Sequence, residues 1–184
     1  MKLPFEHIKR TILIKKSVET HPSFGKNPEQ RSVEELIRYG VINLNKPSGP
    51  TSHQIIDYVK NILNIGKAGH SGTLDPKVTG VLPIALDRAT RVIQVLLNAG
   101  KEYVCLMHVH KEVKEEDIKK AFEKFSGTIE QMPPIRSAVK RQIRTRNVYY
   151  VEMMEIDNKD VLFRIGCQAG TYIRKFVHDL GIYL

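Results

Sequence analysis

The chain is short of cysteine and of long apolar runs, and each absence excludes a class of protein. Its 184 residues include two cysteines, Cys105 and Cys167, which lie far apart and belong to no CxxC pair or metal-binding histidine spacing. They indicate reduced thiols in the core of a cytosolic protein. No apolar run is long enough to cross a bilayer, and the first residues contain no apolar core of a signal peptide. We therefore expect a soluble, intracellular protein without a membrane partner.

Two common kinds of site are also missing from the sequence. No cluster of histidine, cysteine and aspartate has the spacing of metal ligands, so we expect no metal centre. The phosphate-binding patterns GxxxxGKS and GxxxxGKT are absent too, which argues against a nucleotide hydrolase built around Asp75.

Positive charge, in contrast, is in excess. The 29 lysines and arginines outnumber the 20 acidic residues, for a formal net charge of +9. Such a balance favours an anionic partner, nucleic acid first and an acidic membrane surface second, over a merely basic protein. The densest run has no acidic residue within it and fits neither a helix face nor strand alternation; it consists of Arg136, Lys140, Arg141, Arg144 and Arg146. We interpret it as an exposed basic loop that binds phosphates, with a solvated charge run as the alternative.

The most distinctive segment is 69–83. Its glycines allow backbone angles that are closed to other residues, and Pro76 restricts Asp75 to an extended or turn conformation. Asp75 is therefore expected on a shaped loop, before an apolar run, 81–86, that predicts a buried strand or turn. A reactive group on a rigid loop beside the core is typical of active sites. An ordinary Asx turn is the alternative.

Apolar periodicity predicts the surrounding elements. Helices are expected over 32–39, 51–63, 91–97, 115–125 and from about 171 onward, and strands over 41–44, 101–110, 148–156 and 161–167. Apart from its short helix, the stretch 1–40 contains no core of its own and needs another surface to pack on. Lys46 follows the first strand and precedes a turn rich in glycine and proline, where a lysine either contacts phosphate or is solvated.

Four motifs occur in an order that resembles the TruB family of RNA pseudouridine synthases. They are Leu44–Gly49, Gly69–Pro76, Lys101–Val104 and Gly170–Arg174. The resemblance runs from about Val41 to the last residue. The stretch 21–52 resembles the archaeal and eukaryotic branch, the dyskerin-like catalytic subunit of box H/ACA particles. The absence of long lysine-rich tails favours an archaeal protein.

The resemblance implies the fold and the domains. The fold would be the α+β pseudouridine synthase fold, a mixed and mainly antiparallel sheet flanked by helices with a central active cleft. Residues 1–40 would be an N-terminal extension and 41–184 an incomplete catalytic domain. The family continues into a small RNA-binding domain called PUA. We therefore expect a truncated chain whose N-terminal extension normally packs on that domain.

The resemblance also implies conversion of uridine to pseudouridine, without a metal or an organic cofactor. Asp75 would be the essential carboxylate, which either attacks the nucleotide covalently or removes a sugar proton to give a glycal. Arg174 would pair with Asp75 and keep it ionised. Tyr103 would stack on the flipped base and serve in proton transfer.

Further substrate-binding roles follow from the same resemblance. Lys46 would brace the catalytic loop or contact RNA. His70 would support the RNA turn, unless it is hydrogen-bonded within its own glycine loop. Tyr172 would line the pocket, unless it is a core tyrosine. The basic run from Arg136 to Arg146 would form a mobile loop that grips the substrate strand.

The expected partners are a substrate RNA (ribosomal RNA, transfer RNA or both), an H/ACA guide RNA and the small H/ACA core proteins. The expected location is cytoplasmic in an archaeon and nucleolar in a eukaryote. One alternative is a stand-alone synthase for the T-loop uridine of transfer RNA. Another is a non-catalytic ribonucleoprotein scaffold. The presence of Asp75, Tyr103 and Arg174 together argues against a scaffold, which has no need of them.

Overall fold

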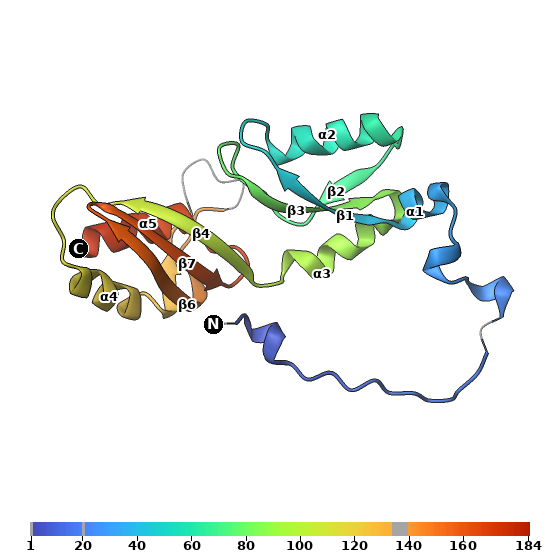
Figure 1. The fold of residues 1–184 in the computed structure, drawn as a ribbon, viewed down its shortest axis with the longest axis horizontal. Coiled ribbons are helices and arrows are strands. Elements are labelled where there is room, and N and C mark those ends of the chain that lie inside the picture. Colours follow the sequence, from blue (N-terminus) through green and yellow to red (C-terminus); the bar gives the residue numbers. More distant parts are fainter. Residues whose placement is uncertain (1, 20, 134–139) are drawn as a thin grey trace. The chain divides into compact units, whose positions relative to one another are not determined.

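A computed structural model describes residues 2–19, 21–133 and 140–184 (Figure 1). The chain divides into two compact units, one comprising Met1–Arg10 with Ala99–Leu184 and the other Thr11–Asn98. Both are α+β with antiparallel strands flanked by helices, so the expected fold class is confirmed, with the strands divided over two sheets. The boundary at residue 41 and the central cleft stay predictions. Within the described ranges, no helix is long and apolar enough to cross a membrane.

The unit Thr11–Asn98 is built around a three-stranded sheet. Its helices and strands are η2 (Pro22–Phe24), η3 (Pro28–Gln30), α1 (Val33–Tyr39), β1 (Val41–Lys46), α2 (Ser52–Leu63), β2 (Ala68–His70), β3 (Gly80–Leu86), η4 (Asp87–Val92) and α3 (Ile93–Leu97). The order is β1-β3-β2, with β3 antiparallel to both neighbours. The predicted apolar face of α2 packs on β3 through Ile55, Ile56 and Val59, which are at most 8% exposed.

Local capping signals account for the helix starts in this unit. The Ser32 hydroxyl accepts from Glu35 N, and the Glu35 carboxylate accepts from Ser32 N, which together form a capping box. Thr51 and Gln54 form the same arrangement at the start of α2. Each box satisfies backbone N–H groups that a helix start leaves without partners. The caps define where α1 and α2 begin, and β1 with the turn after it lies between the two helices in the sequence.

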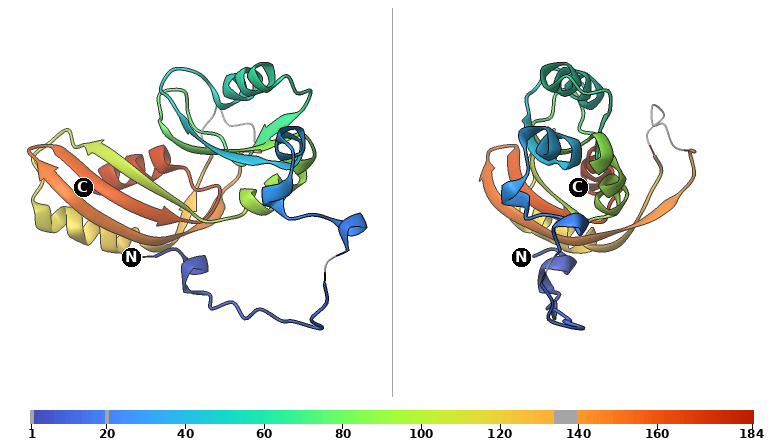
Figure 2. Two further views of the ribbon diagram at one scale, coloured as in Figure 1. Left: turned by 45° about the vertical axis from the view of Figure 1, so that its right-hand side comes forward. Right: turned by 90° about the vertical axis from the view of Figure 1, so that its right-hand side faces the viewer.

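The other unit is a four-stranded antiparallel sheet covered by two helices (Figures 1 and 2). Its elements are η1 (Pro4–His7), β4 (Lys101–His108), α4 (Glu115–Lys124), β5 (Gly127–Gln131), β6 (Arg144–Asp157), β7 (Asp160–Cys167) and α5 (Ile173–Tyr183). The strand order is β4-β7-β6-β5. The core joins Phe122 of α4 and Phe176 of α5 to Phe163 of β7, as their apolar stripes predict. The strands expected over 148–156 and 161–167 form a hairpin, β6 and β7, that turns at Asn158, whose φ is 52°.

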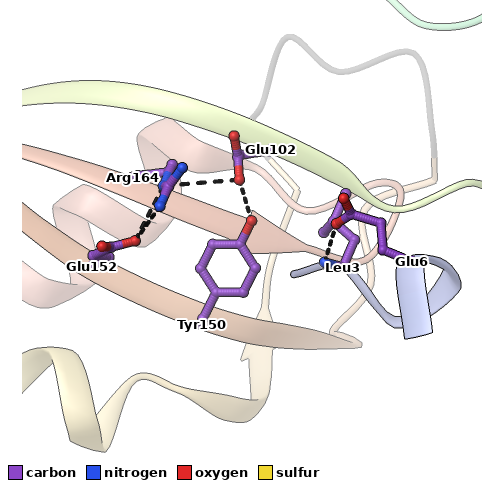
Figure 3. Close-up of polar contacts among 6 residues, drawn as sticks. All are labelled: Leu3, Glu6, Glu102, Tyr150, Glu152 and Arg164. Atoms are coloured by element: carbon purple, nitrogen blue, oxygen red, sulfur yellow. Dashed lines mark hydrogen bonds and ion pairs between the residues drawn. The ribbon is translucent and has the colours of Figure 1, made fainter. Parts of the chain in front are cut away.

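A polar network ties the strands together on the opposite face of this sheet (Figure 3). The Tyr150 hydroxyl donates to the Glu102 carboxylate, and the Arg164 guanidinium pairs with Glu152. A Cβ on Gly166 would lie 2.4 Å from the Tyr150 ring, so only glycine lets the ring approach the strand this closely. Burial, and then the bond to Glu102, raises the pKa of Tyr150 to about 12. The network links side chains of β4, β6 and β7 beside Tyr103, the residue that follows Glu102 on β4.

Candidate active site

Asp75 lies in the connection between β2 and β3, as the glycine and proline pattern predicts. Its side chain is half-buried. The backbone turns directly after it, because Val78 N donates to Asp75 O at 3.0 Å. The carboxylate is therefore carried by a tight turn at the entry to β3, whose Leu82 and Ile84 are fully buried in the core.

Lys46, the last residue of β1, is 0% exposed. Its Nζ donates to three carbonyl oxygens: Pro47 at 2.8 Å, Pro76 at 3.1 Å and Val78 at 2.9 Å. A lysine Nζ carries three N–H donors, so each of them has an acceptor. The alternative that Lys46 is solvated is wrong, because the turn at Asp75 closes over the amine. The geometry is that of a brace between β1 and this turn.

The turn after β1 contacts the loop on both sides of Asp75. Gly49 N donates to Pro76 O at 2.9 Å. On the other side, the Ser52 hydroxyl accepts from Leu74 N at 3.0 Å and donates to Leu74 O at 3.2 Å. Ser52 is not among the site residues that the sequence predicts. The only signal for it was its place at the start of a predicted helix, where Thr51 is the cap.

His70 is the last residue of β2 and is half-buried. Its Nδ1 accepts a hydrogen bond of 3.4 Å from Gly72 N, and its ring lies edge-on to His53 with 5.2 Å between centroids. Burial, followed by the nearby His53, lowers the pKa of His70. A neutral imidazole with Nδ1 as acceptor carries its proton on Nε2. His70 is thus bonded within its own glycine loop, the alternative that the sequence left open, and its contact with RNA stays a prediction.

Tyr103 lies on β4, in the unit that contains Ala99–Leu184, and packs against the buried core cluster of that same unit. Burial raises its pKa to about 12, with smaller contributions from Cys167 and Cys105. The phenol therefore keeps its proton at neutral pH. It can donate a hydrogen bond or present its ring face to a base, but it is not a ready source of phenolate.

Tyr172 and Arg174 lie at the start of α5. Tyr172 is the N-cap residue, half-buried, and Arg174 lies in the first turn and is exposed. Both backbone groups of Tyr172 bond to one side chain: Tyr172 N donates to Gln131 Oε1 at 3.0 Å, and Gln131 Nε2 donates to Tyr172 O at 3.2 Å. Gln131 is 2% exposed. Gln131 is not predicted from the sequence, because β5, which ends at Gln131, carries no strong strand pattern.

The basic run differs from its prediction. Arg136 lies outside the described residues. Lys140 and Arg141 are exposed on irregular backbone, which agrees with a loop. The prediction of a loop is wrong for Arg144 and Arg146, which open β6 and pair with Gln131 and Ile129 of β5. The unpredicted strand β5 supplies these cross-strand hydrogen bonds, which override the irregular charge spacing.

Arg146 also reaches the segment that precedes α5. A Cβ on Gly170 would lie 3.2 Å from Arg146 Nε, so the guanidinium packs over this glycine. Gly170 has a φ of 79°, a conformation that favours glycine. The start of α5 is therefore held by Gln131 of β5 and Arg146 of β6.

The predicted site residues thus fall into two sets, each ordered within its own unit. Lys46, His70 and Asp75 belong to the unit Thr11–Asn98, and Tyr103, Tyr172 and Arg174 to the other. The pairing of Arg174 with Asp75 stays a prediction. Among the described residues, no group of three or more histidine, cysteine, aspartate or glutamate side chains is placed to hold a metal ion.

Two known protein families match the chain. Residues 60–173 match the N-terminal domain of the TruB family of pseudouridylate synthases, and residues 2–56 match the DKCLD (NUC011) domain. A protein of Methanopyrus kandleri named "Probable tRNA pseudouridine synthase B" is 58% identical over 180 residues, or 98% of this chain and 53% of that protein. A protein of Thermococcus onnurineus with the same name is 59% identical over 178 residues, or 96% of this chain and 53% of that protein.

Solved structures agree with this match. A Cbf5-Nop10-Gar1 complex contains a chain that superimposes with a TM-score of 0.91 at 58% identity, over 99% of this chain and 55% of that one. An H/ACA RNP bound to a substrate RNA containing 2′-deoxyuridine gives a TM-score of 0.86 at 54% identity, over 97% of this chain and 53% of that one. The chain spans about half the length of the curated relatives it matches. Since the family match covers more than half of its residues, the chain belongs to the TruB family of pseudouridylate synthases.

Proposed function

We propose that the protein is an RNA pseudouridine synthase in which Asp75 is the catalytic carboxylate. The observation that carries this proposal is the construction of the Asp75 turn. Lys46 and Gly49 bond to the backbone after Asp75, and Ser52 bonds to the backbone before it. A carboxylate whose backbone is held on both sides is prepared for chemistry that depends on its orientation.

The reaction is an isomerisation. The N1–C1′ bond of uridine breaks, the base turns, and a C5–C1′ bond forms, while a proton leaves C5 and N1 gains one. In this proposal Asp75 either attacks the nucleotide or removes a sugar proton to give a glycal. Arg174 pairs with the carboxylate and keeps it ionised. No cofactor enters either route.

The other substrate contacts belong to the same proposal. Tyr103 stacks on the flipped base and, with its proton retained, takes part in hydrogen bonding and proton transfer. His70 supports the RNA beside the flipped nucleotide, and Tyr172 lines the pocket. Lys46 braces the catalytic turn. The basic positions Arg136, Lys140, Arg141, Arg144 and Arg146 bind the phosphates of the substrate strand.

We further propose that the protein acts in the cytoplasm as the catalytic subunit of an RNA-guided box H/ACA particle, on ribosomal RNA and also transfer RNA. One solved relative is a chain of a Cbf5-Nop10-Gar1 complex and another is a chain of an H/ACA RNP bound to a substrate RNA, which supports a guide RNA and small core proteins as partners. Residues 1–40 serve as an extension that packs on a PUA domain, and 41–184 form the catalytic domain. The alternative function is that of a stand-alone transfer RNA synthase, which the names of the curated relatives support.

A tritium-release assay separates these functions. Uridine labelled with tritium at C5 loses its label when pseudouridine forms, so release measures turnover directly. The full-length protein is tested on transfer RNA and on a guide-matched ribosomal RNA fragment, with and without guide RNA and the small proteins. Release that requires guide and proteins supports the RNA-guided function. Release from transfer RNA by the protein alone supports the stand-alone synthase, and no release under any condition favours a scaffold.

A further inference from the structure

Ser52 is one of four buried polar or charged residues in the described part of the chain; the others are Lys46, Ser71 and Gln131. Its side chain is 0% exposed, yet it is the first residue of α2, a place where side chains usually meet solvent. A buried hydroxyl needs hydrogen-bond partners, because leaving it without them is costly. Ser52 finds both of its partners on the backbone of Leu74, 22 residues away in the sequence.

These two bonds determine the path of the chain into Asp75. The Ser52 hydroxyl accepts from Leu74 N and donates to Leu74 O, so it uses its one donor and an acceptor site on a single residue. Leu74 immediately precedes Asp75. Ser52 is itself fixed, because Ile55, one turn further along α2, anchors the helix in the core.

We propose that Ser52 is a positioning residue for the reaction, one that sets the orientation of the Asp75 carboxylate through the backbone of Leu74. This inference rests on the proposed function. Lys46 and Gly49 bond to the residues after Asp75, and without Ser52 the backbone before Asp75 would lose both of its hydrogen bonds at Leu74. A displacement of about 1 Å at a reacting group costs on the order of 100-fold in rate.

The test compares Ser52→Ala with Thr51→Ala in the full-length protein, assembled with guide RNA and core proteins if the wild type requires them. The two changes remove neighbouring hydroxyls at the start of α2: that of Thr51 caps the helix, whereas that of Ser52 bonds to Leu74. We expect Ser52→Ala to lower kcat about 10- to 100-fold, with KM and RNA affinity within about twofold of wild type. Thr51→Ala should lower the melting temperature and leave kcat within about twofold.

A second variant distinguishes loss of positioning from misfolding. Ser52→Cys keeps a weak donor and acceptor of similar size, so it should recover part of the lost kcat. Equal losses of kcat in Ser52→Ala and Thr51→Ala would overturn the inference, because they would assign the effect to helix stability. A Ser52→Ala variant as active as wild type would also overturn it while leaving the proposed function intact. A wild type that releases no tritium would overturn both.

A separate observation assigns the same kind of role to Gln131 in the other unit. Its amide bonds to both backbone groups of Tyr172, two residues before Arg174. An amide that donates and accepts at once reproduces the pairing of a strand neighbour, and it satisfies the N–H and C=O of the residue that starts α5. We propose that Gln131 is a positioning residue that orients Tyr172 and Arg174 toward the substrate.

The matched pair for this test is Gln131→Ala and Glu130→Ala, adjacent on β5 with the second side chain exposed. Gln131→Ala should lower kcat at least about 10-fold while RNA affinity stays within about twofold, and Glu130→Ala should change neither. A third variant, Gln131→Glu, keeps the acceptor and loses the donor when ionised, so its kcat relative to wild type should recover as pH falls. Parallel losses of kcat and RNA affinity in Gln131→Ala, or no loss, would contradict the proposal.

Discussion

The Nζ of Lys46 donates a hydrogen bond of 3.1 Å to the carbonyl oxygen of Pro76, the residue that follows Asp75. The same amine also bonds to Val78, at the end of the turn. A buried donor that spans both positions limits how far the turn can open. The position of the proposed catalytic carboxylate is therefore tied to the end of β1, an element that carries none of the chemistry itself.

Removal of this amine should destabilise the turn and the unit around it. We expect Lys46→Met, which keeps the length of the side chain, to lower the free energy of unfolding by about 3 kcal/mol, because buried carbonyls lose their donor. Turnover should fall at least about 10-fold. Urea unfolding measures the first effect. Lys60→Met is the control, since Lys60 pairs with an exposed Asp57 and should cost no more than about 1 kcal/mol.

Asp75→Asn tests the catalytic assignment directly. The amide has nearly the same shape but is neither a nucleophile nor a base, so tritium release should disappear while RNA affinity stays within about threefold. Filter binding measures the affinity. Asp57→Asn, on the exposed side of α2, should leave both properties unchanged. Turnover retained in Asp75→Asn would show that another group performs the chemistry.

The basic positions should contribute to affinity through phosphate neutralisation. Each phosphate contact on a single strand adds about 0.7 to the slope of log K against log salt, so Arg141→Ala with Arg144→Ala should reduce the slope by about 1.4. Affinity at low salt should fall accordingly. The control removes two exposed lysines of α4, Lys119 and Lys120, which pair with acidic neighbours on their own helix. A slope that is the same in both double variants would contradict the role of Arg141 and Arg144.

Tyr103 should make stability depend on alkaline pH. Burial raises its pKa from 10.0 to about 12, so the folded protein holds this proton more tightly than the unfolded chain does. The resulting stabilisation is complete below pH 10 and is lost as pH rises toward 12. Tyr103→Phe should therefore lose less stability than wild type between pH 9 and pH 11, as measured by urea unfolding. Tyr39→Phe, at a side chain that is 48% exposed, should follow the wild type.

The two thiols should be unreactive in the folded protein. Burial raises the pKa of Cys105 and of Cys167 to about 11, and the thiolate is the reactive form. At pH 8 the thiolate fraction is then on the order of one in a thousand. An aromatic disulfide reagent should titrate neither thiol in the native state and both after unfolding in urea. Rapid labelling of the native protein would show that one thiol is accessible.

The local features of the site could be predicted from the sequence. Some residues act on the backbone only a few positions away: the glycines around Asp75, the proline after it and the caps at Ser32 and Thr51. Their effect can therefore be inferred without knowledge of the fold. The apolar stripe of α2 was predicted in the same way, because it repeats with the helix. The order of the four motifs identified the family before any contact was known.

Contacts between distant residues were decided by the tertiary structure alone. Whether Lys46 is solvated or buried depends on Val78, 32 residues away, which reaches the amine only after β1 and β3 pair. Ser52 and Gln131 look like ordinary polar residues until the backbones of Leu74 and Tyr172 lie against them. Local sequence sets the preferences of a segment, whereas long-range packing selects which buried polar groups meet. For that reason the sequence by itself named the carboxylate, and only the fold revealed what holds it in place.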